Sequence, residues 1–292
     1  MAVVESLRKA GQDAPATESA PVENAEETAL AARAPQEIAP SRDVPQCGID
    51  GMEGEFDESD IKFPSMKIVA GSGPLSARFN GGTIVFADEE LLAPPNLAKP
   101  DPDHAVTFVP FRMVKQFREN VSAAEYAAGK MPEILPSKQA VSEVGGTTEW
   151  IDGMKPSHSP CASVYMLIER PEQSEHPGFS LEFDGRLWAV CVYYASGTGY
   201  NHSARVIFNT AKTSLHVPML DGEGNPVKNE RGVVRRRTYL PKCLWKFRVV
   251  KRKAGDFDVF SPELRLTRTE TGPEAREYLD SLNFDGQGGD DN

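Results

Sequence analysis

The sequence lacks the long apolar runs and paired cysteines that would define several classes of protein at once. No stretch approaches the roughly 20 consecutive apolar residues of a membrane span, and the first residues lack the apolar centre of a secretory signal. The four cysteines lie far apart, at Cys47, Cys161, Cys191 and Cys243. In a reducing compartment such isolated cysteines are expected to stay thiols. These absences favour a protein of the cytoplasm.

Catalytic and metal-binding motifs are also missing. The sequence contains no nucleophile elbow, no phosphate-binding loop ending in Lys-Ser or Lys-Thr, and no zinc-protease helix. The segment 197–202 begins like a dinucleotide fingerprint but has His202 in place of the third glycine, so we expect a loop. His158 and Cys161 share a proline-rich loop without the second pair that a zinc finger needs. We therefore expect no catalytic site, no metal and no cofactor.

Charge is distributed unevenly along the chain. Residues 1–60 hold 14 Asp and Glu against four Lys and Arg, and residues 270–292 hold seven against one. Segments so acidic and so poor in apolar residues cannot offset the entropy of ordering them. We predict a disordered arm over 1–60, a β-rich core over 61–269, and a short helix with an acidic tail over 270–292. The core holds 27 Lys and Arg against 22 Asp and Glu, so it is basic although the chain carries −11.

Apolar residues in the core recur closer to every second than to every 3.6 residues, which indicates strands. The pair Asp184-Gly185 suits a type I′ hairpin turn, and the strand after it is apolar on both faces, as in a central strand. Helices are predicted over 122–130, from a capping box at Ser122 and Glu125, and over 273–282. The predicted strands are 62–69, 83–86, 105–117, 163–169, 179–183, 186–194, 204–209, 233–240, 244–253 and 257–268.

Many short strands with few helices predict a mainly β fold, either a barrel or a sandwich. Among barrels, an OB-fold with long decorated loops suits a core of this length. A β-sandwich remains the alternative fold. The decorations would be the loops 93–104, 131–159 and 217–232.

The most distinctive segment is basic. Residues 228–253 contain eleven Lys and Arg against the single acid Glu230. In the strand from Leu244, Trp245 and Phe247 would face the core, while the alternate cations would form a line of charge. Three consecutive arginines must point to both faces of any strand, so we expect one of 235–237 to be forced inward unless a ligand holds it. The alternative is that these cations bind no ligand and form a solvated strand face, whose positive charge balances the negative charge of the acidic arms.

Binders of single strands also need aromatic faces on which bases stack. Aromatic residues lie among cations at Phe111, Tyr194 and Tyr200, although an aromatic residue in a strand is more often core. Trp188, Trp245 and Phe247 are expected to be core. The predicted nucleic-acid-binding residues are Phe111, Arg112, Lys115, Tyr194, Tyr200, Arg235, Arg236, Arg237, Lys242, Lys246, Arg248 and Arg252.

A basic β body followed by an acidic, glycine-containing tail, from Asn283 to Asn292, resembles the phage and bacterial single-stranded DNA-binding proteins. The resemblance implies an OB-fold, binding of single-stranded DNA during replication or recombination, and partner proteins recruited by the tail. For a phage protein the compartment would be the host cytoplasm. The sequence departs from the bacterial pattern because Phe284 precedes the tail acids, which puts recruitment through the last residues in doubt.

Other classes remain open. A viral structural or assembly protein can also combine a β core with disordered arms, and an adaptor can bind a protein partner through a strand edge. The pattern does not choose between DNA and RNA, and it leaves the oligomeric state open.

Overall fold

The structure is a computed structural model, and it describes residues 63–71, 73–94, 104–172, 174–254 and 257–282. The predicted arm over 1–60 and the end of the predicted tail lie outside these residues. The described residues belong to one compact unit, Phe56–Asn292. Its strands are β1 (Ser65–Ile68), β2 (Ile84–Phe86), β3 (Glu90–Ala93), β4 (Val106–Glu119), β5 (Ile134–Leu135), β6 (His158–Glu169), β7 (Leu181–Phe183), β8 (Arg186–Ser196), β9 (His216–Pro218), β10 (Arg236–Thr238), β11 (Cys243–Ala254) and β12 (Phe257–Glu270).

Short helices connect the strands. They are η1 (Pro74–Ala77), α1 (Ala123–Ala127), α2 (Lys138–Glu143), α3 (Gly197–His202), α4 (Ala204–Ser214), η3 (Leu240–Lys242) and α5 (Pro273–Ser281). The mainly β prediction is therefore confirmed. No helix in the described part of the chain has the length and apolar character needed to cross a membrane.

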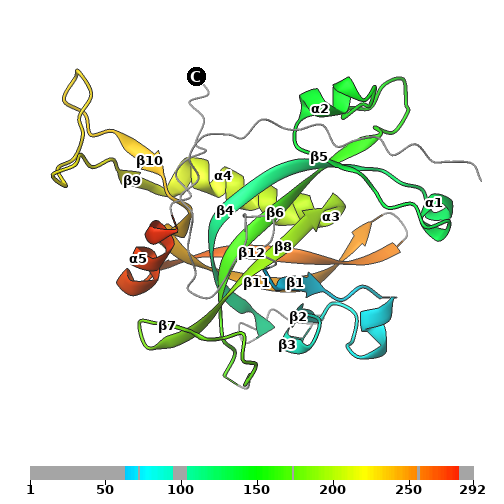
Figure 1. Cartoon of the computed structure of the whole chain (residues 1–292), viewed down its shortest axis with the longest axis horizontal. Coiled ribbons are helices and arrows are strands. Elements are labelled where there is room, and N and C mark those ends of the chain that lie inside the picture. The colour runs from blue at the N-terminus through cyan, green and yellow to red at the C-terminus, as the bar shows by residue number, and fades with distance from the viewer. Residues whose placement is uncertain (1–62, 72, 95–103, 173, 255–256, 283–292) are drawn as a thin grey trace, which may run out of the picture. The chain divides into compact units, whose positions relative to one another are not determined.

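Ten strands form one sheet in the order β12-β11-β4-β6-β8-β1-β2-β3, with β5 added to β4 and β7 added to β8. The sheet curls into a half-barrel (Figure 1). Its two ends approach each other, because a Cβ atom on Gly81 would lie 2.6 Å from Cε2 of Phe260 in the edge strand β12. A side chain at position 81 would require the Phe260 ring to move.

The hairpin β7–β8 forms as the sequence predicts. Asp184 and Gly185 both have positive φ, at 52° and 71°, as a type I′ turn requires. β8 pairs with β6 along one edge and with β7 and β1 along the other, so the central position predicted for it is confirmed.

The two faces of the sheet have separate cores. The inner face buries the larger cluster, which includes Phe108, Val164 and Phe247. The outer face buries a smaller cluster around Val109, Leu167 and Trp188. The predicted alternation of β11 is confirmed: Trp245, Phe247 and Val249 are buried, while Lys246, Arg248 and Arg252 are half-exposed.

Two predictions about the segment after β8 are wrong. Residues 197–202 form the helix α3, and the strand predicted at 204–209 is the start of the helix α4. The strand was predicted because three successive residues favour strands, namely Val206, Ile207 and Phe208. However, the buried residues of α4 are Ala204, Ile207 and Ala211, which follow the helical spacing of three and four.

Both predicted helices are confirmed, with shorter bounds for α1. Leu279 of α5 is buried against the outer face of the sheet, so this helix belongs to the body. The strand predicted over 233–240 contains only β10, and the loop predicted over 131–159 carries β5, α2 and the start of β6. Cys161, Cys191 and Cys243 are buried free thiols, and Cys47 lies outside the described residues.

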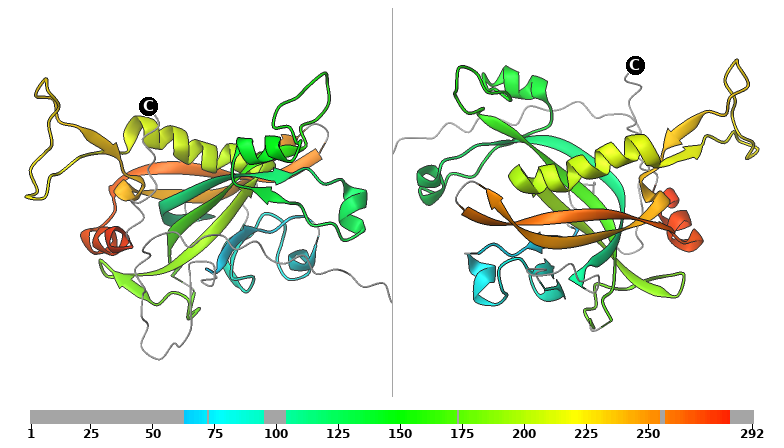
Figure 2. Two further views of the ribbon diagram at one scale, coloured as in Figure 1. Left: turned by 45° about the horizontal axis from the view of Figure 1, so that its top comes forward. Right: turned by 180° about the vertical axis from the view of Figure 1, so that it is seen from behind.

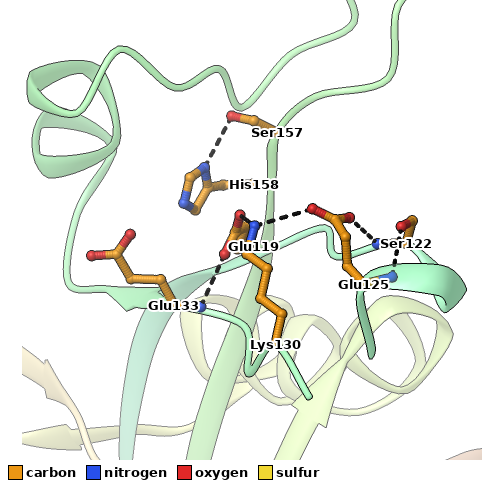
Figure 3. A network of polar contacts seen from close by, with 7 residues as sticks. All are labelled: Glu119, Ser122, Glu125, Lys130, Glu133, Ser157 and His158. Atoms are coloured by element: carbon orange, nitrogen blue, oxygen red, sulfur yellow. Dashed lines mark hydrogen bonds and ion pairs between the residues drawn. The ribbon is translucent and has the colours of Figure 1, made fainter. Parts of the chain in front are cut away.

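The capping box of α1 is present (Figure 3). Glu125 N donates to Ser122 Oγ at 3.2 Å, and Ser122 N donates to the Glu125 carboxylate at 2.8 Å. The hydroxyl and amide of Ser122, with the ammonium of Lys130, lower the pKa of the Glu125 carboxyl from 4.5 to about 2. Lys130 also binds Glu119 at 2.6 Å. Through this ion pair the α1 hairpin is fixed to the end of β4.

Candidate nucleic-acid interface

The structure divides the predicted basic segment between two places. The part before residue 239 lies in an arm, residues 216–238, in which β9 pairs with β10 away from the main sheet (Figures 1 and 2). Both faces of this ribbon are solvated, so Arg235 and Arg236 are exposed and neither is forced inward. The expectation of a buried arginine is therefore wrong. Arg237 is half-buried, and its guanidinium lies 5.5 Å from the ring centroid of Tyr239.

The second part of the basic segment lies on β11, where some of the charged side chains already bind other residues of the protein. Arg248 forms an ion pair with Glu263 of β12 at 3.0 Å. Lys246 donates to Thr107 Oγ1 at 2.7 Å, and Lys242, just before β11, donates to the His216 carbonyl at 3.0 Å. β11 therefore carries an interrupted line of charge in place of the continuous one that the sequence suggested.

A different surface brings aromatic and basic residues together. On the outer face of the sheet, Arg112 of β4 lies opposite Tyr165 of β6, which lies opposite Val192 of β8. The next row on the same face places Ser163 opposite Tyr194. Tyr165 and Tyr194 are thus diagonal neighbours on adjacent strands, about 7–8 Å apart, which is within reach for aromatic rings.

The two tyrosines differ in how firmly they are held. Tyr165 is half-buried, with the Phe63 ring edge-on at 5.8 Å and the Phe111 ring at 6.5 Å. The Arg112 guanidinium lies 5.5 Å from its ring centroid. Tyr194 is 64% exposed. Tyr165 is therefore a fixed platform, and Tyr194 offers a ring to the solvent beside it.

A polar cleft of about 320 Å³ lies at the end of this face and is lined by Arg118, Lys155, Ser159 and Ser196. Arg118 donates to Ser196 Oγ at 3.5 Å and to the Tyr126 hydroxyl. Neither Arg118 nor Lys155 forms an ion pair with any described residue. The cleft therefore combines two cations and two hydroxyls, which are the groups that bind phosphate oxygens.

One carboxylate, that of Glu119, also lines the polar cleft. The ammonium of Lys130 and the backbone N–H of Glu133 hold the pKa of this carboxyl below its usual value (Figure 3). Because Glu119 already forms an ion pair with Lys130, its carboxylate repels an anion near Arg118 less strongly.

A larger cleft of about 630 Å³ lies where the sheet ends approach each other. The pairing of β1 with β8 stops at Met66 and Tyr193, so the two strands separate beyond that point. Ile68, Leu75 and Phe260 line the opening, and Tyr194 lies at its edge. The exposed tyrosine thus borders both the outer face and an apolar cleft.

Of the predicted site residues, the structure places Arg112 and Tyr194 on the same face of the sheet, with β6 between them. Phe111 is 8% exposed and belongs to the outer core cluster, so its ring cannot stack on a base. Tyr200 is half-buried against the inner core, and burial raises the pKa of its hydroxyl. Lys115 is exposed, but it lies opposite Ala162 on the inner face, over the ring of Phe117.

The sequence patterns did not select Tyr165, Lys155 or Arg118. Tyr165 could have been found from the alternation of Ser163, Tyr165 and Leu167 in its strand. Arg118 meets Ser196 across 78 residues, and no local pattern signals that contact.

Whether His158 and Cys161 could share a metal ion depends on which faces of their strand they occupy. His158 and Cys161 belong to β6, not to a loop, and they point to opposite faces because they are three residues apart. His158 Nδ1 lies 3.0 Å from Ser157 Oγ. Within the ranges that the structure describes, no three His, Cys, Asp or Glu side chains cluster as metal ligands.

Comparison of the chain with protein-family models, curated proteins and solved structures finds no match.

Proposed function

We propose that the protein binds single-stranded nucleic acid, and DNA in the first instance, on the outer face of β4, β6 and β8. One observation supports this most strongly. The rows from Arg112 to Arg118 on β4, with their partners on β6 and β8, carry two tyrosines and two arginines on the outer face and contain no Asp or Glu. Of these four side chains Tyr194 is exposed and the others are half-buried. On this site Tyr165 and Tyr194 stack on bases, and Arg118 and Lys155 bind phosphates.

This chemistry suits binding without sequence preference. Every base has a face that can stack on an aromatic ring, and each stacked base contributes about 1–3 kcal/mol. An OB-fold also uses a strand face and the neighbouring loops to bind oligonucleotides. We propose that the half-barrel is an elaborated relative of that design, acting in DNA replication or recombination as the resemblance to phage and bacterial proteins implies. Recruitment of partner proteins by the acidic tail stays a prediction.

Binding of a fluorescent oligo(dT) by the full chain, followed by anisotropy as salt is raised, tests the proposal. The logarithm of the affinity should fall linearly with the logarithm of the salt concentration. Arg118→Ala should weaken binding and make the slope shallower by about 0.7, the value of one phosphate contact on a single strand.

Arg186→Ala is the matched control, because Arg186 is equally a surface arginine but pairs with Glu169 at 3.2 Å. It should leave both affinity and slope unchanged. If the full chain does not bind oligo(dT) at any salt, the proposal is wrong. Large oligomers in the same samples would then favour the assembly protein.

A further inference from the structure

A second basic surface lies away from the proposed single-strand site. The helix α4 and the strand β9 lie in a stretch, from Arg186 to Leu220, that contains no Asp or Glu, and the arm beyond it carries Asp221, Glu223 and Glu230. In this stretch α4 buries Ala204, Ile207 and Ala211 and exposes Arg205, Phe208 and Lys212 on its other side. Lys212 Nζ lies 4.6 Å from the ring centroid of Phe208. The exposed side of α4, which is about 16 Å long, therefore carries two cations and no acid.

The arm continues this surface, because β9 begins two residues after α4 ends. Beyond β9 and β10 the arm forks at Met219, Val227 and Arg235. Met219 N donates to Arg235 O at 2.9 Å, Arg235 N to Val227 O at 2.8 Å, and Val227 N to Met219 O at 2.8 Å. Two tips result, residues 220–226 and 228–234, each closed by a β-bridge.

Each tip is held by one side chain that accepts backbone hydrogen bonds. Asp221 accepts from Asn225 N at 2.8 Å and from Glu223 N at 3.0 Å. Asn229 accepts from Val233 N at 2.9 Å and from Arg231 N at 3.0 Å. Because the tips are already ordered, a partner that contacts them does not have to offset the entropy of ordering a loop.

The arm presents cations and apolar side chains to the solvent together. Lys228, Arg231, Arg235 and Arg236 are exposed, and none forms an ion pair with another described residue. Leu220 and Val233 are 60% and 61% exposed, one in each tip. Val233 shares its tip with Lys228 and Arg231, whereas Leu220 lies beside the exposed acids Asp221 and Glu223. An exposed apolar residue among unpaired cations, as at Val233, is the combination found where proteins enter a DNA groove and wedge between base steps.

We propose that the surface formed by α4 and the arm binds double-stranded DNA, so that the protein recognises a junction between single-stranded and duplex DNA. Recognition of the junction rests on the proposed function. A two-stranded ribbon fits the major groove of duplex DNA.

The two surfaces are linked through α3. Ser196 and Gly197 line the polar cleft that contains Arg118, and α3 runs from there to the start of α4. A strand leaving the outer face at this cleft would therefore meet α4 and then the arm.

The test compares three probes with the full chain: oligo(dT), a blunt duplex of about 20 base pairs, which is two helical turns, and the same duplex with an oligo(dT) tail. The tailed duplex should bind at least about tenfold tighter than oligo(dT), because two linked contacts reinforce each other. The variant R231A/R235A/R236A should lower that affinity to the level of oligo(dT) and leave oligo(dT) binding within about twofold. Arg186→Ala is the control, and an unchanged melting temperature confirms that the variant folds.

The outcomes separate the two proposals. If the tailed duplex binds no tighter than oligo(dT), or if the arm variant weakens both probes equally, the duplex site is wrong and the single-strand site stands. If oligo(dT) does not bind but the duplex does, and the arm variant abolishes that binding, the single-strand site is wrong and the duplex site stands. If the arm variant binds both duplex probes as tightly as the original protein, the duplex site is also wrong.

Discussion

Replacing Phe111 with Ala is expected to lower the free energy of unfolding by about 3–5 kcal/mol, the usual cost of deleting a buried phenyl ring. Phe111 is 8% exposed and clusters with Val109, Leu167 and Leu279 between the sheet and α5. It is also the extra residue at the irregularity between Pro110 and Arg112, where two residues of β4 lie opposite one of β6. Urea denaturation followed by tryptophan fluorescence measures the loss.

The same substitution separates a core residue from a stacking platform. Once binding is expressed per folded molecule, the affinity of Phe111→Ala for oligo(dT) should stay close to that of the original protein. If Phe111→Ala does not fold, Phe111→Leu keeps most of the side-chain volume and should lose only about 1 kcal/mol. Full stability together with weakened binding would show that Phe111 contacts the nucleic acid, contrary to its burial.

Replacing Tyr194 with Ala should have the opposite profile. Tyr194 is 64% exposed, so the stability should change by no more than about 0.5 kcal/mol. The affinity for oligo(dT) should fall by about 1–3 kcal/mol for the stacked base that is lost, which is roughly 5- to 140-fold. Anisotropy titration at constant salt measures this change.

Tyr194→Phe is the control, since it keeps the ring and removes only the hydroxyl. It should retain most of the affinity, and this result would distinguish stacking from a hydrogen bond made by the hydroxyl. An alanine variant that binds as tightly as the original protein would remove Tyr194 from the site.

Local patterns in the sequence predicted the features that depend on near neighbours. The Asp184-Gly185 turn, the capping box at Ser122, and the alternation along β11 each involve residues a few positions apart, so the chain itself defines them. The position of β8 as a central strand also followed from its two apolar faces. These features were enough to predict the mainly β class and the burial of Trp188, Trp245 and Phe247.

Features that depend on distant contacts were not predictable in the same way. The register between β4 and β6 places Arg112 over Tyr165, and these residues are 53 positions apart in the sequence. α4 was mistaken for a strand because Val206, Ile207 and Phe208 favour strands locally, whereas packing of its Ala-Ile-Ala side decided the structure. The arginines 235–237 seemed to require a buried partner only because a strand in a large sheet was assumed. In the arm, Arg235 and Arg236 are exposed to solvent, and the half-buried Arg237 lies over the ring of Tyr239.

The arrangement of the outer face is the central claim, and photochemical cross-linking tests it most directly. An oligo(dT) in which iodouracil replaces some bases can be irradiated in complex with the full chain, and the linked residues mapped by mass spectrometry. The account predicts cross-links to Tyr194 and Tyr165, on neighbouring strands of the outer face. Cross-links confined to the arm or to β11, with none on these two tyrosines, would contradict it.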